Sequence, residues 1–305
     1  MKREKLLVPI GFVVVVAVWS TTWFAIKIGL NSIPPVFGIA FRFTLAALVL
    51  SIIMILRGDR VVIDKKSLLI FLMLGVFSFS TPYMLIYWAE MVVPTGLTSI
   101  LFAAYPFVVA IGSELFLPQE RMTVYKAAGI LLGFAGIVVI FWTDLISGSS
   151  NLRAMGGILL SAIMQGTTLV MVKKHGKDIS PFTLNLCSMV IGIIVLYTIA
   201  FSMEDISSIH FDAAGIGSIV YLGTFGTVIA FVVYYWLLKR VEAVYLSLIS
   251  FITPIFAVIL GALFLGEEFS SRVFSGAALV LLGILFTNGK DVKKIFEKQA
   301  GDVIP

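Results

Sequence analysis

Three ionisable side chains, Lys27, Arg42 and Glu90, lie inside stretches of sequence that are otherwise apolar. A charged group far from bulk water needs a carboxylate or carbonyl partner. Arg42 follows Pro35 by seven residues, which places it about 10 Å below the end of a helix beginning there. Glu90 is the acidic residue expected at a comparable height. We predict that Glu90 pairs with Arg42 or with Lys27, as a gate or a structural tie. For Lys27, anchoring at the lipid headgroups is the alternative.

Aromatic and hydroxyl side chains recur at helical spacing and could form a binding cavity for an organic molecule. Trp19 and Trp23 are four residues apart and therefore share a helix face, as do Ser99 and Phe102 three apart. The predicted cavity residues are Trp19, Trp23, Tyr83, Tyr87, Ser99, Phe102, Tyr105, Gln165, Thr168, Tyr235, Ser247, Ser250 and Phe251. Hydroxyls that join neighbouring helices, and aromatic side chains in an interfacial belt, are the competing interpretations.

The residues give no support for a metal site, a cofactor site or an ATP motor. His175 and His210 are isolated, Cys187 is the single cysteine, and no Gly-x-x-x-x-Gly-Lys phosphate loop occurs. Clustered catalytic groups are also missing, so the sequence does not predict an enzyme. An integral-membrane enzyme acting on lipid-linked substrates stays open as an alternative function.

The elements that must position these residues are membrane-spanning helices. The chain has 305 residues, of which 60% are hydrophobic and 13% charged, and such a composition cannot cover a water-facing surface. Runs of about 18 or more apolar residues are long enough to cross the hydrocarbon layer. Ten such runs are predicted, at 7–30, 36–56, 67–91, 96–117, 125–142, 154–172, 182–202, 213–238, 243–265 and 273–288.

The positive charge of the chain follows the predicted connections between helices. With the N-terminus inside, eighteen of the 22 Lys and Arg residues lie on the cytoplasmic side, and only Arg153 and Arg272 lie outside. This bias predicts a multi-pass protein of the cytoplasmic membrane with both termini inside, in contact with lipid. It also accounts for the net charge of +5 without nucleic acid as a partner.

The second half of the chain repeats the first. At a shift of 146 residues Lys27 meets Lys173, and at a shift of 148 the Tyr87-Trp88 pair meets Tyr235-Trp236. We predict an all-α membrane protein with two five-helix repeats, 1–145 and 151–290, followed by a basic cytoplasmic tail, 291–305. Because five is an odd number, the second repeat enters the membrane from the opposite side. Inverted-topology repeats of this kind are common in transporters.

The pattern of residues resembles the EamA-type members of the drug/metabolite transporter superfamily. The matching residues are Trp19-Ser20, Lys27, Pro35, Arg42, Ala46-Ala47, Tyr87-Trp88-Ala89, Tyr105-Pro106, Phe116-Leu117, Glu120, Thr253-Pro254 and Leu263-Phe264-Leu265-Gly266-Glu267. Two departures are Gln165, which stands where a repeat of Trp19 is expected, and Glu114, at a position expected to be small or apolar.

The resemblance implies a secondary transporter that moves a small organic metabolite by alternating access. Export of an amino acid or a related compound is the leading interpretation on the family resemblance alone. A membrane scaffold without transport is a further alternative. Glycines at helical spacing, Gly129, Gly133 and Gly136, are echoed by Gly276 and Gly283. They predict close helix packing within the bundle, with formation of a homodimer as the alternative.

Overall fold

The computed structural model is a bundle of helices, and it describes residues 2–286 apart from 60, 62, 118–122, 148–150, 248 and 284. No strand occurs in these ranges. The elements are α1 (Lys2–Leu30), α2 (Pro35–Arg57), α3 (Lys65–Leu74), η1 (Gly75–Ser80), α4 (Thr81–Val92), α5 (Thr95–Phe102), α6 (Tyr105–Phe116), α7 (Val124–Ser147), α8 (Asn151–His175), α9 (Pro181–Met203), η2 (Ile206–Ser208), α10 (Ala213–Gly223), η3 (Thr224–Ile229), α11 (Ala230–Leu238), α12 (Ala243–Ser247) and α13 (Ile249–Leu265). A further helix, Ser271–Gly283, follows α13.

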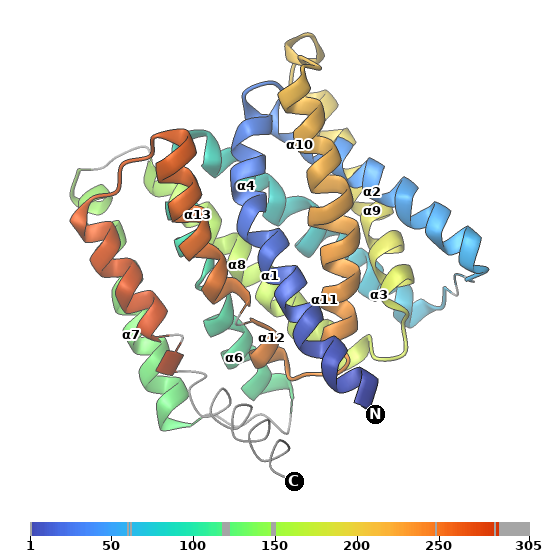
Figure 1. Ribbon diagram of the computed structural model, residues 1–305, viewed down its shortest axis with the longest axis horizontal. Helices are drawn as coiled ribbons and strands as arrows, with labels where there is room; N and C mark the ends of the chain where they lie inside the picture. The colour runs from blue at the N-terminus through green and yellow to red at the C-terminus, as the bar shows by residue number, and fades with distance from the viewer. Residues whose placement is uncertain are drawn as a thin grey trace.

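Seven helical spans are long and apolar enough to cross a membrane. The described residues also form three shorter apolar helices, Ala127–Ile140, Ile252–Leu265 and Ser271–Gly283. The described residues of the predicted apolar runs are therefore mostly helical, but the number of ten crossings stays a prediction. Figure 1 shows these helices packed side by side, with α1 crossing the front of the bundle.

Two spans contain a π-helical turn in the middle, which the sequence pattern did not predict. The span Lys65–Val92 consists of α3, η1 and α4, and the span Ala213–Leu238 consists of α10, η3 and α11. The π-helical segments, Gly75–Ser80 and Thr224–Ile229, are related by the shift that aligns the two halves, to within one residue. A π-helical turn interrupts the regular ladder of backbone hydrogen bonds and is frequent at functional sites.

The predicted helix 96–117 is interrupted in the structure. The segment α5 ends at Phe102 and α6 begins at Tyr105, with Pro106 in the first turn of α6. Proline has no backbone N–H to donate, so a helix tends to begin or break near it. The equivalent Pro254 remains inside α13, so the two halves differ at this point.

The first helix of each half packs against the other half in the same way. Helix α1 contacts α10, α11 and α13, whereas α8 contacts α4, η1, α5 and α6. The second helices of the two halves, α2 and α9, pack against each other. The halves therefore interlock along a common seam, and this seam positions the side chains described below.

The glycine faces predicted in the last helix of each half pack against each other inside the chain. A methyl group added at Gly136 would lie 2.6 Å from the carbonyl oxygen of Gly276, and one added at Gly283 would meet the backbone of Gly129 and Gly133. In Figure 1 these two helices, α7 in green and the last helix in red, lie along one edge of the bundle. These glycines therefore allow close packing of α7 against the last helix within the chain, which is the first of the two roles predicted for them.

Candidate functional site

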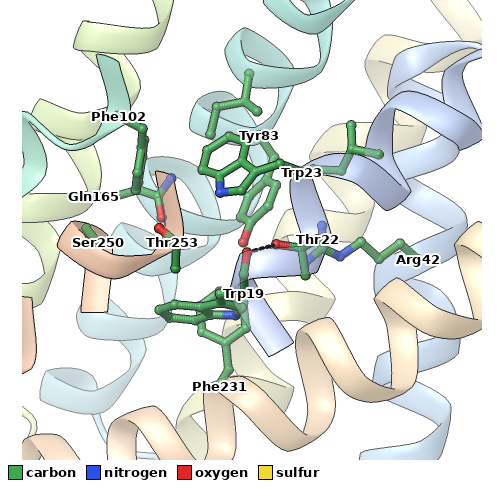
Figure 2. Close-up of a pocket in the computed structure, with 12 residues that line it drawn as sticks. Trp19, Thr22, Trp23, Arg42, Tyr83, Phe102, Gln165, Phe231, Ser250 and Thr253 are labelled. Atoms are coloured by element: carbon green, nitrogen blue, oxygen red, sulfur yellow. Dashed lines mark hydrogen bonds between the residues drawn. The ribbon is translucent and has the colours of Figure 1, made fainter. Parts of the chain in front are cut away.

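A cavity of about 60 Å³ lies on the seam between the two halves. We call it the central cavity. Its lining residues are Trp19, Thr22, Trp23, Ile26, Arg42, Tyr83, Ile86, Phe102, Gln165, Phe231, Ser250 and Thr253. They come from α1, α2, α4 and α5 of the first half and from α8, α11 and α13 of the second. Figure 2 shows the labelled side chains converging from these helices. Seven of the predicted site residues, including Arg42, line this cavity.

Trp19 is held in place by the other half of the chain. Its indole N–H donates to the carbonyl oxygen of Gly226 at 3.2 Å. Its ring contacts Tyr234, with ring centroids 4.9 Å apart, and Phe231, with centroids 5.3 Å apart. Gly226 belongs to the π-helical segment η3. The hydrogen bond from Trp19 therefore joins the first half of the chain to the segment of the second half in which the regular backbone hydrogen bonding is interrupted.

Arg42 is the charged group of the central cavity, and its side chain is only 1% exposed. Its Nε donates to the hydroxyl of Thr227 at 2.8 Å, while its terminal nitrogens lie 3.4 Å from the Tyr87 hydroxyl and from the Gly226 carbonyl. The guanidinium also lies over the ring of Tyr83, 4.9 Å from its centroid. Within the described ranges no carboxylate pairs with it, so the buried cation faces neutral groups only.

A second, smaller cavity of about 40 Å³ adjoins the first and shares Trp19, Phe102 and Gln165 with it. We call it the inner cavity. Two further predicted residues, Tyr105 and Tyr235, line it. An aromatic series connects the two cavities, because Trp23 contacts Phe102, and Phe102 stacks on Tyr105 with ring centroids 5.7 Å apart.

The inner cavity is closed by a hydrogen bond between the two halves. The hydroxyls of Tyr105 and Tyr234 lie 2.7 Å apart, and both side chains are buried. A basic cavity of about 140 Å³ is lined by Tyr235 together with Lys173, Lys177 and Lys239. Because Tyr235 lines both this basic cavity and the inner cavity, its side chain lies at the boundary between them.

Several predicted cavity residues lie outside the central and inner cavities. Ser99 donates to the carbonyl of Gly96 at 2.7 Å, and Thr168 donates to the carbonyl of Gln165 at 2.9 Å, so both bond within their own helices. Tyr87 lines a separate narrow space near the end of α1. Ser247 is buried away from the lining. The side chain of Phe251 is outside the described part of the structure.

Neither predicted ion pair of Glu90 forms in the described residues. Lys27 donates to the main-chain carbonyl of Glu90 rather than to its carboxylate, and Arg42 bonds to Thr227. Glu90 is fully buried, and neither of its carboxylate oxygens accepts a hydrogen bond from any described residue. Lys27 and Glu90 are in contact, but through the Glu90 main chain, so the predicted pairing of the Glu90 carboxylate with Arg42 or Lys27 is wrong for the described residues. The sequence could not indicate which backbone carbonyls the bundle leaves available.

Sequence analysis missed several residues that form the site. Thr22, Phe231 and Thr253 line the central cavity, and Thr227 holds Arg42. Phe231 follows a π-helical segment that no hydrophobic period reveals. Thr253 had a signal, because it lies three residues after Ser250 on the same face of α13. No group of three or more His, Cys, Asp or Glu residues that could hold a metal occurs in the described chain.

Comparison with known proteins identifies the family. The model of the EamA-like transporter family matches residues 7–142 and again residues 152–289. The chain belongs to the EamA-like transporter family. Two copies of the EamA-like domain thus occupy most of the sequence, and the chain is a multi-pass membrane protein of a transporter family.

Curated relatives of this EamA-like chain are also named as transporters. It is 27% identical to the transporter YoaV of Bacillus subtilis, over 91% of this chain and 95% of that protein. It is 31% identical to a transporter of Archaeoglobus fulgidus, over 88% of this chain and 94% of that protein. One solved crystal structure has a TM-score of 0.70 at 19% identity, covers 92% of this chain and 96% of its own, and so shares the fold.

Proposed function

We propose that this chain is a secondary transporter that moves a small organic metabolite across the cytoplasmic membrane by alternating access. The two EamA-like copies would be inverted repeats of five crossings each, 1–145 and 151–290, with a basic tail at 291–305. The substrate would bind in the central cavity, because residues of both halves converge there. A site on the seam of two inverted halves can be exposed to either side of the membrane by rocking one half against the other.

Reciprocal contacts support the inverted arrangement. Lys27 donates to the carbonyl of Glu90, and its repeat mate Lys173 donates to the carbonyl of Leu238 at 2.6 Å. Glu90 and Leu238 are related by the same shift of 148 that aligns Tyr87-Trp88 with Tyr235-Trp236. Equivalent contacts at the ends of equivalent helices favour two copies of one design. The distribution of Lys and Arg favours an orientation with both termini inside.

The proposed substrate class rests on one observation, the burial of Arg42 in the lining of the central cavity. A buried guanidinium that lines a cavity and has no carboxylate partner is suited to bind an anionic group of a ligand. The rings of Trp19, Trp23 and Phe102 provide an apolar wall next to it. We therefore propose a substrate with a carboxylate and a small apolar part, such as an amino acid or a related compound.

The size of the site agrees with such a substrate. A water molecule needs about 10–15 Å³ of cavity volume, when the volume is the space open to the centre of a water-sized sphere. The central cavity of about 60 Å³ therefore has room for roughly five water-sized groups, and the adjoining 40 Å³ adds roughly three more. Export from the cytoplasm is the direction that we propose, on the resemblance to EamA-type transporters.

The proposal is tested by reconstituting the purified chain into proteoliposomes and measuring flux of a panel of labelled amino acids and other carboxylates. We expect saturable flux of at least one carboxylate, reduced strongly by Trp19→Ala, which removes aromatic wall from the cavity. Arg153→Gln serves as the control variant, because Arg153 is exposed in the first turn of α8. Absence of saturable flux across the panel would favour the scaffold alternative, and chemical conversion of a lipid-linked compound would favour the enzyme.

A further inference from the structure

Glu90 presents a carboxyl group that the described packing does not stabilise. It lies in the last turn of α4, its residue is 0% exposed, and neither side-chain oxygen has a hydrogen-bond partner within the described residues. An ionised carboxylate that is buried without hydrogen bonds is strongly disfavoured, so such a group is either protonated or directly paired. The neutral acid is the form that fits this arrangement.

The charged groups around Glu90 can be followed element by element. Helix α1 brings Lys27, whose ammonium donates to the Glu90 main chain. The chain after α13 brings Glu267, but its carboxylate accepts the backbone N–H groups of Thr95 and Gly96 at the start of α5. The segments α5 and η1 carry no ionisable side chain. The first half of α2 carries one charged side chain, Arg42, which is bonded to Thr227. The first half of α8 likewise carries one, Arg153, which is exposed.

The position equivalent to Glu90 in the second repeat is Leu238, and its contacts show whether the fold needs a carboxyl group there. Lys173 reaches the carbonyl of Leu238 at 2.6 Å and that of Val241 at 2.5 Å, just as Lys27 reaches the carbonyl of Glu90. In both halves the lysine therefore holds the end of the third helix through the backbone. Leu238 fills the second position without a charge, so the carboxyl group of Glu90 is not needed for this contact.

A cavity large enough to hold water lies next to this group. A cavity of about 360 Å³ at this end of the bundle includes Lys27, Asn31, Leu265 and Glu267 among its lining residues. We call it the mouth cavity. Lys27 both lines the mouth cavity and contacts Glu90. A movement of α1 away from α4 would therefore withdraw the ammonium from the carbonyl and admit water to the carboxyl.

We infer that the Glu90 carboxyl is a proton-binding site that couples opening of the mouth cavity to release of one proton. In the arrangement described here the carboxyl holds its proton. When α1 and α4 separate, the O–H bond breaks, the proton passes to water in the mouth cavity, and the carboxylate is left hydrated by that water. Closing reverses each step. This inference rests on the proposed function, since it assigns the proton as a ligand of the same transport cycle.

The linkage has a definite sign and size. Because the closed arrangement binds one more proton than the open arrangement, a fall in pH on the mouth side favours closure. One linked proton changes the ratio of open to closed molecules by up to tenfold per pH unit. Without the carboxyl, the ratio should not depend on pH in this way.

The protonation state can be measured without knowledge of the substrate. Infrared difference spectra of the purified protein near neutral pH should contain a carboxylic-acid C=O band that is lost in Glu90→Gln. Glu268→Gln is the matched control, because Glu268 is exposed near the same end of the bundle. If Glu90→Gln removes no such band while the wild type is folded, Glu90 is ionised and the inference is wrong.

Stability provides a second readout. Glu90→Leu copies the residue at the repeat-equivalent position, so we expect a melting temperature equal to or above that of the wild type. A carboxylate that is paired with Lys27 would give the opposite result, a clear loss of stability in both Glu90→Leu and Glu90→Gln. That loss would overturn the inference even if either variant folds poorly.

The linkage itself is measured by electron–electron distance spectroscopy. Spin labels at Asn31, which follows α1, and at Val92, the exposed last residue of α4, both line the mouth cavity. They are introduced after Cys187→Ser has removed the only native cysteine. In the wild type the longer-distance population should fall as pH is lowered, and in Glu90→Gln it should stay constant. An unchanged population in the wild type, or the same pH response in Glu90→Gln, would refute the linkage. These outcomes do not depend on finding flux, so they separate this inference from the proposed function.

Discussion

Replacing Arg42 by glutamine tests the assignment of the substrate class most directly. The guanidinium has five N–H donors, and the described structure gives it one short bond, to Thr227 at 2.8 Å. The contacts with Tyr87 and Gly226, both 3.4 Å long, are beyond the usual range of about 2.7–3.2 Å. Arg42 therefore retains donors that a ligand carboxylate in the central cavity could engage in a bidentate, charge-assisted pair.

The size of the effect follows from the burial of the pair. Removing one partner of a buried, hydrogen-bonded charge pair costs about 2–5 kcal/mol of binding free energy. At about 1.4 kcal/mol per tenfold, Arg42→Gln should weaken binding of a carboxylate ligand by about 30-fold to a few thousand-fold. The neutral amide of the same ligand should bind the wild type weakly, and it should lose much less affinity in the variant.

The assay compares ligands in matched pairs. Amino acids that show flux in proteoliposomes are titrated against the purified protein by calorimetry, each beside its own amide. Circular dichroism and the melting temperature establish that Arg42→Gln is folded, and Arg153→Gln controls for loss of one positive charge. Equal affinity of the wild type for acid and amide would refute the reasoning, as would a folded Arg42→Gln variant that binds the acid as tightly as the wild type.

Three further predictions concern stability and closure. Glu267→Ala removes two hydrogen bonds at the start of α5 and should cost about 1–3 kcal/mol of unfolding free energy in detergent; equal cost in exposed Glu268→Ala would contradict this. Tyr105→Phe and Tyr234→Phe remove the same bond, so in a double-mutant cycle the double variant should lose less stability than the sum; strict additivity would argue against the bond. Hydrogen bonds from the backbone N–H of α10 and from a serine hydroxyl hold the pKa of Asp212 below its usual value. Its contribution is therefore complete above about pH 4 and lost as the pH falls through the lowered pKa, and Asp212→Asn should flatten the acid part of a melting-temperature profile.

The sequence predicted the helices well because each is coded locally. The long apolar runs locate the seven long helical spans, although not the π-helical segments or the break between α5 and α6. Trp19 and Trp23, which are predicted to share a helix face, both line the central cavity. The aromatic residues of α4 and α5 were also found from type and spacing. Their identification depends on helical geometry alone, which the sequence contains.

Partners across the bundle could not be predicted in the same way. Lys27 and Arg42 were expected to reach a carboxylate, but both bond to groups set by packing, a helix-terminal carbonyl and the hydroxyl of Thr227. The carbonyl of Gly226, which accepts from Trp19, lies in a π-helical segment that the apolar pattern did not predict. Ser99 bonds within its own helix, which the periodic pattern cannot distinguish from facing a cavity.

The differences between the two halves indicate where the specific chemistry lies. Contacts that hold the bundle together are repeated, as in the lysines that reach equivalent helix ends. At the shifts that align the halves, Arg42 instead meets Ser188 and Glu90 meets Leu238. An anion-binding group and a proton-binding group need only one copy, whereas two conformations of similar energy need a scaffold that is nearly the same in both halves. In the transport cycle that we propose, the duplicated part would permit the change of access, and the unmatched residues would determine what is bound when access changes.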